Sequence, residues 1–583
     1  MKKILTLALL IIAGFGCNSK KTENAGEQNQ QFDQFKNEFV ERMWEIYPSW
    51  ASSQGYHKYD SVLVIPNEES DKKQLTFANE NLDSLKAYDL KKLSDNNKTD
   101  LYMIENQLKS IVWAINDMKS GEWNPASYNI SGDFAEMINN NYDSLDVRLH
   151  NLGIKLSNIP AYYEAAKKNI KNPTLEHTQL AIEQNMGGIS VFEDDLANAL
   201  KESKLSDEEK LLISNRSKLA VGAIKSYVDF LKTMKNETPR SFRLGEELYR
   251  KRFEFDIQSG YTADEVLAKA IAHKQELHQK MAEISIKLWP KYFAGKEMPK
   301  DSLLLIRQMI EKLSLIHVQP DSFQTAIEKQ IPVLVNFIKE KNLIYIDPSK
   351  PLVVRKEPDY MAGVAGASIS APGPYDKTGN TYYNVGSLSG WDKDRSESYL
   401  REYNQYILQI LNIHEAIPGH YTQLVYANQS PSLIKSLLGA SSMVEGWAVY
   451  TERMMLEEGY GNNEPEMWLM YYKWNLRSTC NFILDNSVHT KNMSKEDAMN
   501  LLMNEAFQQK TEAENKWRRV QLTQVQLCCY FTGYTEIYDF REEMKKKQGD
   551  KFNLKAWHEK FLSYGSAPVK YIRQLMLEEG RAH

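Results

Sequence analysis

Cysteine is scarce in this chain, which has four among 583 residues. The spacing C-x-x-C does not occur, so a cysteine-based zinc site is excluded. If Cys17 carries a lipid, the remaining three cysteines are odd in number, and two of them, Cys528 and Cys529, are adjacent. Adjacent cysteines rarely pair with each other, so a disulfide framework is not expected, even in an oxidising compartment.

The chain also lacks an excess of positive charge. Its formal net charge is −5, and removal of Lys2 and Lys3 with a cleaved leader would lower it by two, to −7. A nucleic-acid partner is therefore not expected. After residue 31 there is no Gly/Ser linker, repeat or block of like charge, and no stretch beyond the N-terminus is apolar for long enough to cross a bilayer. We therefore expect one domain over residues 32–583.

The first 17 residues predict a lipoprotein-type signal peptide. Lys2 and Lys3 precede an apolar stretch that is too short to span a membrane, and Gly16-Cys17 is similar to a lipoprotein cleavage site. A simple secretory signal is the alternative. Residues 18–31 are polar and predict a flexible tether. We expect an exported protein of the periplasm or cell envelope, anchored to a membrane through a lipid on Cys17.

Hydrophobic periodicity predicts a mainly α fold, with two lobes around a cleft and a small β-sheet next to the active-site helix. Long stretches such as 75–118, 161–202 and 207–235 have the apolar spacing of amphipathic helices. Residues 343–386 are richer in β-branched and aromatic residues, with candidate strands at 343–346, 352–354 and 381–385. A helix over 396–413 then leads into the metal-site region, about 396–460, and a C-terminal lobe covers about 461–583.

Residues 414–420 read His-Glu-Ala-Ile-Pro-Gly-His, and Glu445 follows. Two imidazoles and a carboxylate can hold Zn²⁺ while a fourth position stays open for water, and Glu415 is placed to take a proton from that water. On a regular helix His414 and His420 would lie roughly 120° apart around the axis and about 9 Å apart along it, which one metal cannot bridge. Pro418 and Gly419 permit a break, so we expect His414 near the end of a regular helix and His420 after a kink.

The dipeptide His-Glu alone is weak support, because His558-Glu559 shows it too without a second histidine nearby. The alternative reading of 414–420 is an ordinary helix C-terminus. Glu445 favours the metal, since it falls in an apolar helix over 440–458, where an acid is costly to bury without a partner. Glu452 lies seven residues on, on the same face, so either glutamate could be the ligand and the other its neighbour.

The strand before the metal helix suggests how a substrate is held. Extended peptides commonly bind by adding to the edge of a sheet. Tyr382-Tyr383-Asn384-Val385 is the candidate edge, and Tyr383 is a candidate for contact with the substrate or for a place next to the metal ligands. A plain loop-and-hairpin insertion is the alternative.

Two long segments resemble the bacterial domain-of-unknown-function 885 family: His414 to Gln423, and Val444 to Glu452. The likeness extends over most of the mature chain, through residues 47–57, 477–489, 519–533 and 557–568. It departs at Asn481, where the family usually has Arg, and at 523–525, which leaves substrate preference open. Members are predicted metallopeptidases, often lipid-anchored and similar in plan to gluzincins. The resemblance implies a single metallopeptidase-like domain with a zinc-dependent hydrolase activity on peptides.

Further polar residues are candidates for the site. Asp485 and His489 lie four apart on one predicted helix face and are the rival metal pair, although a place beside the metal or substrate suits them better and a surface pair is the alternative. Arg519 and Gln526 lie seven apart on one face, close to Tyr530. A phenol or an Arg can donate to an oxyanion. The resemblance favours Tyr530 for this role, and His558 could donate to the same oxygen or cap a helix.

The predicted mechanism combines these residues. Zn²⁺ bound by His414, His420 and Glu445 activates water, Glu415 moves the proton, and Tyr530 with His558 stabilises the oxyanion. One alternative is a lipid-anchored protein that binds peptides or glycans without cleaving them. Another is a zinc hydrolase of cell-wall amides or esters. The oligomeric state and the choice between endo- and exopeptidase action are not determined by the sequence.

Overall fold

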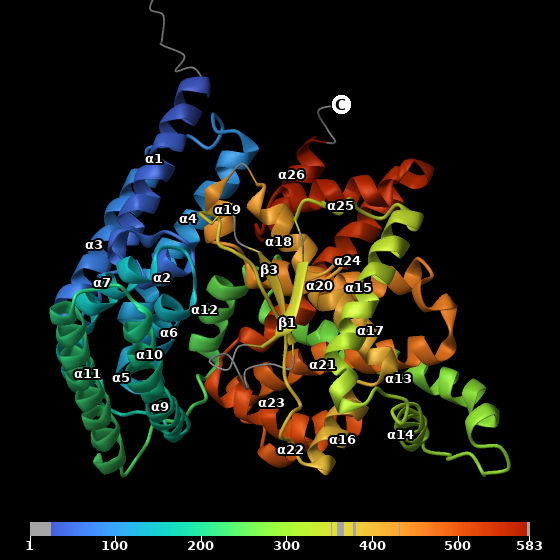
Figure 1. Cartoon of the computed structure of the whole chain (residues 1–583). Coiled ribbons are helices and arrows are strands. Elements are labelled where there is room, and N and C mark those ends of the chain that lie inside the picture. The colour runs from blue at the N-terminus through green and yellow to red at the C-terminus, as the bar shows by residue number, and fades with distance from the viewer. Residues whose placement is uncertain (1–24, 351, 358–366, 377–379, 431, 580–583) are drawn as a thin grey trace, which may run out of the picture.

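Helices dominate the computed structural model, which describes residues 25–350, 352–357, 367–376, 380–430 and 432–579 (Figure 1). A single three-stranded sheet lies among the described residues, beside the helix that carries His414. The prediction of a mainly α fold with a small sheet next to the active-site helix is confirmed. None of the helices in the described ranges is long and apolar enough to cross a membrane.

The N-terminal third supplies two groups of helices. The first group joins the main core and comprises α1 (Ala25–Ile46), α2 (Pro48–Ser53), α3 (Glu68–Leu85), α4 (Asp95–Trp113) and α5 (Ser120–Trp123). The second group, which we name the side lobe, comprises α6 (Ser131–Asn139), α7 (Leu145–Leu156), α8 (Ile159–Asn169), α9 (Leu175–Gly187), α10 (Leu196–Glu202) and α11 (Asp207–Thr233). The side lobe has a hydrophobic core of its own, around Tyr163 and Tyr227.

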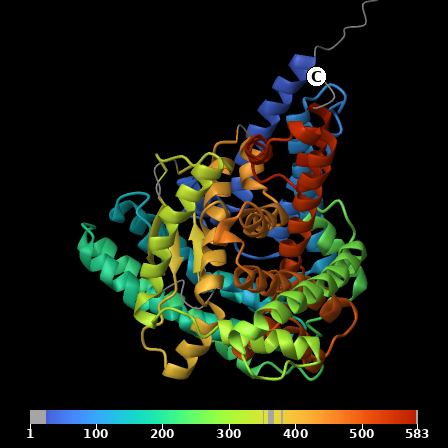
Figure 2. The same cartoon turned by 90° about the vertical axis from the view of Figure 1, so that its right-hand side faces the viewer.

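The remaining helices surround the metal-site region. Those before the sheet are α12 (Glu246–Ile257), α13 (Ala263–Tyr292), α14 (Ser302–Leu313) and α15 (Phe323–Lys341). Those after it are α16 (Lys393–Glu402), α17 (Gln405–Glu415), α18 (His420–Asn428), α19 (Leu433–Leu437), α20 (Ser441–Glu457), α21 (Pro465–Thr490), α22 (Lys495–Asn500), α23 (Lys510–Leu522), α24 (Cys529–Gln548), α25 (Leu554–Ser563) and α26 (Val569–Glu579). The last helix, α26, returns to the N-terminal part and lies beside α4 (Figure 2). There Tyr571 of α26 stacks on Tyr102 of α4 with ring centroids 5.2 Å apart.

Many of the helices begin at the capping residues that the sequence supplies. Thr262 accepts a hydrogen bond from the backbone of Glu265, whose side chain accepts one from the backbone of Thr262 in return, and Asn67 makes the same box with Ser70. These bonds satisfy backbone N–H groups that a helix start leaves without partners. Helix α21 differs from an amphipathic helix because residues on all of its sides are buried, along nearly all of its length.

The sheet has the order β1-β3-β2, formed by β1 (Leu352–Lys356), β2 (Ala367–Ser370) and β3 (Thr381–Val385). β1 pairs with β3 in parallel, Leu352 opposite Thr381, and β2 pairs with β3 antiparallel, Ala367 opposite Val385. The predicted strands at 352–354 and 381–385 are confirmed. The prediction that Tyr382–Val385 is an edge is wrong, because β3 is the central strand, and residues 343–346 form no strand.

Three predicted boundaries also change. Residues 25–31, expected in the flexible tether, form the first turns of α1. The helix expected over 396–413 is two helices, because the chain breaks at Tyr403 and restarts with Asn404 as the N-cap of α17. The stretch 75–118 is divided between α3 and α4, and Ser94 caps the second of these. Cys17 and the signal peptide lie outside the described residues.

Candidate metal centre

The break between His414 and His420 brings the two imidazoles together. Helix α17 ends at Glu415, and α18 begins at His420. The backbone N–H of Gly419 donates to the carbonyl of Ile413 over 2.9 Å, which folds the connection back against the end of α17. The two imidazole centroids lie 4.8 Å apart. This confirms the expectation that His414 lies near the end of a regular helix and His420 after a kink.

Glycine is required at the return of this connection. A Cβ on Gly419 would lie 1.8 Å from the carbonyl oxygen of His414 and 2.3 Å from that of Ile413. Both distances are far below van der Waals contact, so any side chain at this position would push the two halves of the motif apart. The Pro-Gly pair that separates this motif from H-E-x-x-H therefore shapes the turn that places His420.

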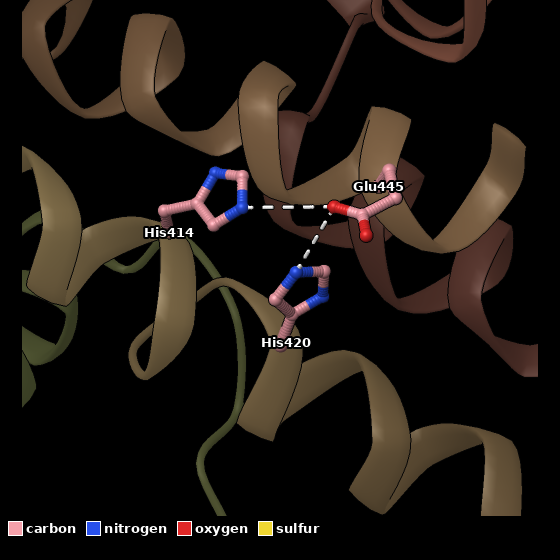
Figure 3. Close-up of side chains that lie close together, drawn as sticks. All are labelled: His414, His420 and Glu445. Atoms are coloured by element: carbon pink, nitrogen blue, oxygen red, sulfur yellow. Dashed lines mark ion pairs between the residues drawn. The ribbon is translucent and has the colours of Figure 1, made fainter. Parts of the chain in front are cut away.

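Glu445 completes a trio of potential ligands (Figure 3). It projects from α20, and its Oε2 lies 3.3 Å from Nε2 of His420 and 3.7 Å from Nε2 of His414. Ligand atoms about 2.1 Å from a tetrahedral zinc ion lie about 3.4 Å from one another. The donor set and the distances of Glu445 from the two imidazoles therefore fit a zinc ion with three protein ligands.

Glu452 lies about two helical turns after Glu445 on α20 and contacts the other ring nitrogen of His414. Nδ1 of His414 donates to Glu452 Oε1 over 2.7 Å, and Nε1 of Trp474 donates to the same oxygen over 3.0 Å. Because Nδ1 is used in this bond, Nε2, which faces Glu445, is the ring nitrogen left to bind a metal ion. Such a carboxylate fixes the tautomer and ring orientation of a ligating histidine. Of the two glutamates, Glu445 is thus the one placed among the imidazole nitrogens, and Glu452 lies behind them.

Glu415 follows His414 in the last turn of α17. Burial raises the pKa of its carboxyl, as do Glu445 and Glu452, whereas the two histidines oppose the rise. No hydrogen bond to its carboxylate is made by any residue in the described part of the chain. An acid with a raised pKa and free oxygens, next to a metal trio, is suited to moving a proton.

The site as a whole has more negative than positive charge. Glu415, Glu445 and Glu452 surround two imidazoles. Burial alone would lower the pKa of His414, but its bonds to Glu445 and Glu452 raise that pKa to about 10. Burial alone would raise the pKa of Glu445, yet His420 and His414 hold it well below its usual range. Three carboxylates around two histidines are a setting that a divalent cation would neutralise.

A close contact between two helices brings Tyr530 toward the trio. A Cβ on Gly446 would lie 2.3 Å from the carbonyl carbon of Gly533, so α20 and α24 touch through their backbones at this point. Glu445 precedes Gly446, and Tyr530 lies one helical turn before Gly533. Burial raises the pKa of Tyr530, and the Glu445 carboxylate is the next largest cause of the rise.

Arg519 and Gln526 also meet at Tyr530. Nη2 of Arg519 donates to Oε1 of Gln526 over 2.6 Å and to the hydroxyl of Tyr530 over 3.2 Å. Since that hydroxyl oxygen accepts from Arg519, its own proton is free to be donated elsewhere. The prediction that Arg519 and Gln526 share one helix face is wrong, because α23 ends at Leu522 and Gln526 begins a separate 3-10 helix. The bend between them nevertheless brings both side chains together, and Arg519 also reaches Tyr530.

His558 is not part of this site, and its predicted role as an oxyanion donor is wrong. The side chain is fully buried, with Nδ1 donating to the carbonyl of Leu343 and Nε2 accepting from the hydroxyl of Tyr450, both over 2.8 Å. Burial lowers its pKa to about 4. Both ring nitrogens are therefore used to join α25 to its neighbours.

Asp485 and His489 do not form a metal pair. Nε2 of His489 donates to the carbonyl of Val520 over 2.9 Å, and Asp485 accepts from the backbone N–H of Val525 over 3.0 Å. Both side chains are buried, and neither belongs to the metal trio. They fasten α21 to the segment around 520–525, so the rival metal pair and the surface pair are both wrong, and a place beside the metal or substrate stays a prediction.

Tyr383 of β3 contacts α17, the helix that carries His414. It is fully buried in β3, and its hydroxyl donates to Oδ1 of Asn412 over 2.8 Å. Asn412 lies two residues before His414, so this bond holds α17 against the sheet. The predicted contact of Tyr383 with substrate is wrong, because a central strand with inward side chains has no free face there.

Two residues near the site were missed by the sequence analysis. Trp474 donates to Glu452, and Glu512 pairs with Arg477 over 2.6 Å. Trp474 lies in a helix that is buried on nearly all sides and mixes polar with apolar residues, so its sequence gives no periodic signal for the face that meets Glu452. Glu512 lies in α23, a strongly polar helix, so nothing in the neighbouring sequence distinguishes it from the other charged residues of that helix.

The comparisons with known proteins agree with this architecture. The family described as "Bacterial protein of unknown function (DUF885)" matches residues 48–576. A solved structure from Shewanella oneidensis, described as a proposed lipoprotein of unknown function, is 56% identical and has a TM-score of 0.86, with 94% of this chain and 99% of that one covered. A proposed lipoprotein from Colwellia psychrerythraea is 16% identical, with a TM-score of 0.77 over 95% of this chain and 100% of that one. At that identity it shows the fold alone.

A third solved structure is an M32 carboxypeptidase from Deinococcus radiodurans R1, 10% identical, with a TM-score of 0.36 over 95% of this chain and 98% of that one. A likeness of that level carries no argument about fold or activity. No curated protein matches the chain.

Proposed function

The chain belongs to the bacterial DUF885 family, and we propose that it is a zinc-dependent hydrolase that cleaves peptide bonds. The observation that carries the proposal is the convergence of His414, His420 and Glu445, whose ligand atoms all lie within 4.8 Å of one another. Two imidazoles and one carboxylate, with the fourth position open, are the ligand set of catalytic zinc in peptidases. A zinc ion bound there would lower the pKa of a water ligand and polarise the scissile carbonyl.

Glu415 is the proposed proton carrier. It lies beside the first ligand on α17, and its raised pKa suits a group that takes a proton from water and gives it to the leaving amine. The negative charge of Glu445 and Glu452 favours uptake of that proton, and the histidines limit the rise of its pKa. Glu452 keeps His414 oriented through Nδ1, which leaves Nε2 free to bind the metal.

Tyr530 is the proposed donor to the oxygen of the carbonyl under attack. Its hydroxyl accepts from Arg519 and retains its own proton, which it can direct at that oxygen. Donors that are already fixed where charge develops contribute strongly to catalysis, because they need no reorganisation during the reaction. The backbone contact of Gly446 with Gly533 sets the separation of Tyr530 from Glu445.

A peptide substrate is supported by the sheet. β2 is an edge strand in the described sheet, and it packs against α17. An extended peptide that adds to β2 would run beside the helix that carries His414 and Glu415. This edge replaces β3, which is paired on both sides.

We also propose export to the cell envelope and a lipid on Cys17. The similar structures from Shewanella and Colwellia are described as proposed lipoproteins, which supports this location. Substitution of Cys17 by Ala should move the protein from the membrane fraction to the soluble fraction, and retention in the membrane would contradict the anchor.

The test of the function is metal content together with turnover. Purified wild type should contain about one zinc ion per chain, and the variant His420→Ala should lose it together with cleavage of a mixed peptide library. His489→Ala is the matched control, because this histidine lies outside the trio and should leave the zinc in place. Zinc retained without His420, or no peptide cleaved by the zinc-loaded protein, would overturn the proposal.

A further inference from the structure

Arg519 is a cation without a carboxylate partner at the edge of the candidate site. It lies on α23, partly exposed, and among the described residues its side chain bonds only through Nη2, to Gln526 and Tyr530. Among the described residues no carboxylate oxygen lies within 4.0 Å of its guanidinium. A guanidinium has five N–H donors in a planar fork that matches a carboxylate, so Nε and Nη1 are left to bind something else.

The surroundings of Arg519 are electropositive. Glu512 is the acid shared by Arg477, at 2.6 Å, and Lys516, at 3.8 Å, and it also lies within electrostatic reach of Arg519. The neighbouring pair of Lys473 and Glu402, 2.8 Å apart, is neutral in sum. Three basic groups around one carboxylate leave positive charge in local excess.

The excess of positive charge affects the pKa of Lys516. Burial lowers the pKa of its amine to about 7, and repulsion from Arg477 adds to the effect more than Glu512 opposes it. An anionic group that entered beside Arg519 would relieve the repulsion. The neighbourhood is thus suited to receive negative charge from a ligand.

The position of Arg519 limits which anion can reach it during catalysis. Its Nη2 lies 3.2 Å from the hydroxyl of Tyr530. A hydrogen bond from that hydroxyl to a carbonyl oxygen spans about 3 Å, and the free Nη1 and Nε lie about 2.3 Å from Nη2 across the guanidinium, so these donors lie within about 8.5 Å of the carbonyl under attack. One residue of extended chain spans about 3.5 Å, and one hydrogen bond adds about 3 Å. A single residue fits between the scissile carbonyl and Arg519, whereas two would need about 10 Å.

We propose that Arg519, held by Gln526, binds the free C-terminal carboxylate of the substrate, so that the protein removes one residue at a time from the C-terminus of peptides. This inference rests on the proposed peptidase function and names the substrate class of the same site. A carboxylate on the side chain of the last residue has the same chemistry. The backbone carboxylate is the one we assign, because it lies at a fixed distance from the scissile bond.

Three peptides of one sequence, blocked at the N-terminus, test the assignment. The first ends in a free carboxylate, the second in a carboxamide, and the third in a carboxamide with Glu as its last residue. The full-length zinc-loaded protein should cleave the first at least about 100-fold faster, in kcat/KM, than the other two, because a site built to bind a charged carboxylate with a cation discriminates against a neutral amide. Equal rates for acid and amide would overturn the proposal, and a preference for the third peptide would assign Arg519 to an acidic side chain instead.

The variants Arg519→Gln and Arg519→Lys locate the effect. Gln should abolish the preference for the free acid, and Lys should retain part of it, since it keeps the charge but not the fork. Arg518→Gln is the matched control: Arg518 is the adjacent residue, its side chain is 55% exposed, and it pairs with Glu183 of the side lobe. It should behave as wild type. A preference that survives in Arg519→Gln would contradict the assignment.

A binding measurement separates this inference from the proposed function. Calorimetric titration with an N-acetylated amino acid and its amide reports the subsite without turnover. Tighter binding of the acid by wild type, lost in Arg519→Gln, would support the carboxylate subsite even if no peptide is cleaved. Equal binding of acid and amide would overturn the subsite even if the protein proves to be a peptidase.

Discussion

Gly446 of α20 and Gly533 of α24 are in direct backbone contact. A Cβ on Gly533 would lie 1.7 Å from the carbonyl oxygen of Ser442, and a Cβ on Gly446 would lie 2.3 Å from the carbonyl carbon of Gly533. One helix carries Glu445 and the other carries Tyr530. The two glycines therefore set the distance between a proposed metal ligand and the proposed oxyanion donor.

Substitution of Gly533 by Ala should separate these helices. Overpacking of this kind costs about 1–3 kcal/mol, so the melting temperature should fall and turnover should fall with it. Gly222→Ala is the control, because nothing lies within 4 Å of its added Cβ in α11, and a helical Gly→Ala change stabilises by about 0.5–1 kcal/mol. A Gly533→Ala protein that melts and reacts as wild type would contradict the role of the contact.

Replacement of Glu415 by Gln should remove turnover and leave the zinc bound. The amide cannot accept the proton from water, and loss of a general base costs about 10²–10⁴-fold in rate. Glu559→Gln is the matched control, since Glu559 follows His558 in the same dipeptide but accepts from the backbone of Tyr345, far along the chain from the motif. Metal analysis and initial rates are the measurements. A Glu415→Gln variant with full activity would assign the proton transfer to another group.

Replacement of Glu452 by Gln should weaken zinc binding without removing a ligand. The hydrogen bond from His414 Nδ1 would lose its charged acceptor, and such changes cost about 10–100-fold in metal affinity. Competition with a chromophoric chelator measures the affinity. The exposed Glu464, at the start of α21, supplies the control variant Glu464→Gln, which should bind zinc as wild type does. Unchanged affinity in Glu452→Gln would show that His414 is oriented by packing alone.

Replacement of Tyr530 by Phe should lower kcat and leave zinc content unchanged. Loss of one oxyanion donor typically costs about 10²–10³-fold in kcat. Tyr538, on the outer part of the same helix, is the control, because its hydroxyl donates to Glu457 and not toward the trio. A drop in zinc content in Tyr530→Phe, with kcat unaffected in the loaded fraction, would assign the phenol a structural role.

Asp485 should make the stability of the protein fall as pH rises. Burial raises its pKa to about 7, whereas the unfolded chain has about 3.8. The folded state therefore holds the proton more tightly. The stability due to this group is fully present below about pH 4 and is lost as pH rises through 7. The difference between the two pKa values corresponds to roughly 4 kcal/mol.

The variant Asp485→Asn keeps an acceptor for the N–H of Val525 and removes the charge. Melting temperatures measured from pH 4 to pH 8 should show the variant gaining on wild type as pH rises, with the largest gain at pH 8. A constant difference between the two proteins over this range would mean that Asp485 does not titrate there.

Local sequence was sufficient for the mainly α fold, for two of the strands and for the convergence of His414, His420 and Glu445. The spacing of His414 and His420 requires a broken helix, and Pro418 and Gly419 supply it. The apolar pattern around Glu445 marks a buried acid. These inferences succeed because the causes lie within one or two turns of chain.

Other features depend on segments that are distant in sequence. The central place of β3 is decided by β1 and β2, which pair with it on both sides, so Tyr383 could not be recognised as buried from its own strand. His558 is followed by Glu, as His414 is, but its ring nitrogens are bonded to Tyr450 and to the backbone of Leu343. Likewise, Asp485 and His489 are spaced like ligands, but the segment near residue 520 occupies both of them.

The stacking of Tyr571 on Tyr102 has a consequence for how the protein is made. A chain that emerges from its N-terminus presents α4 long before α26 exists, and the partner ring is separated from it by most of the sequence. The part of α4 that carries Tyr102 therefore stays uncovered until α26 has been synthesised, because a contact between distant segments forms only after the intervening chain is complete. The segments that carry His414, Glu445 and Tyr530 all lie between α4 and α26 in the sequence. Metal loading would accordingly be a terminal event in maturation, and a protein shortened by its final helix should accumulate in a form that is prone to proteolysis.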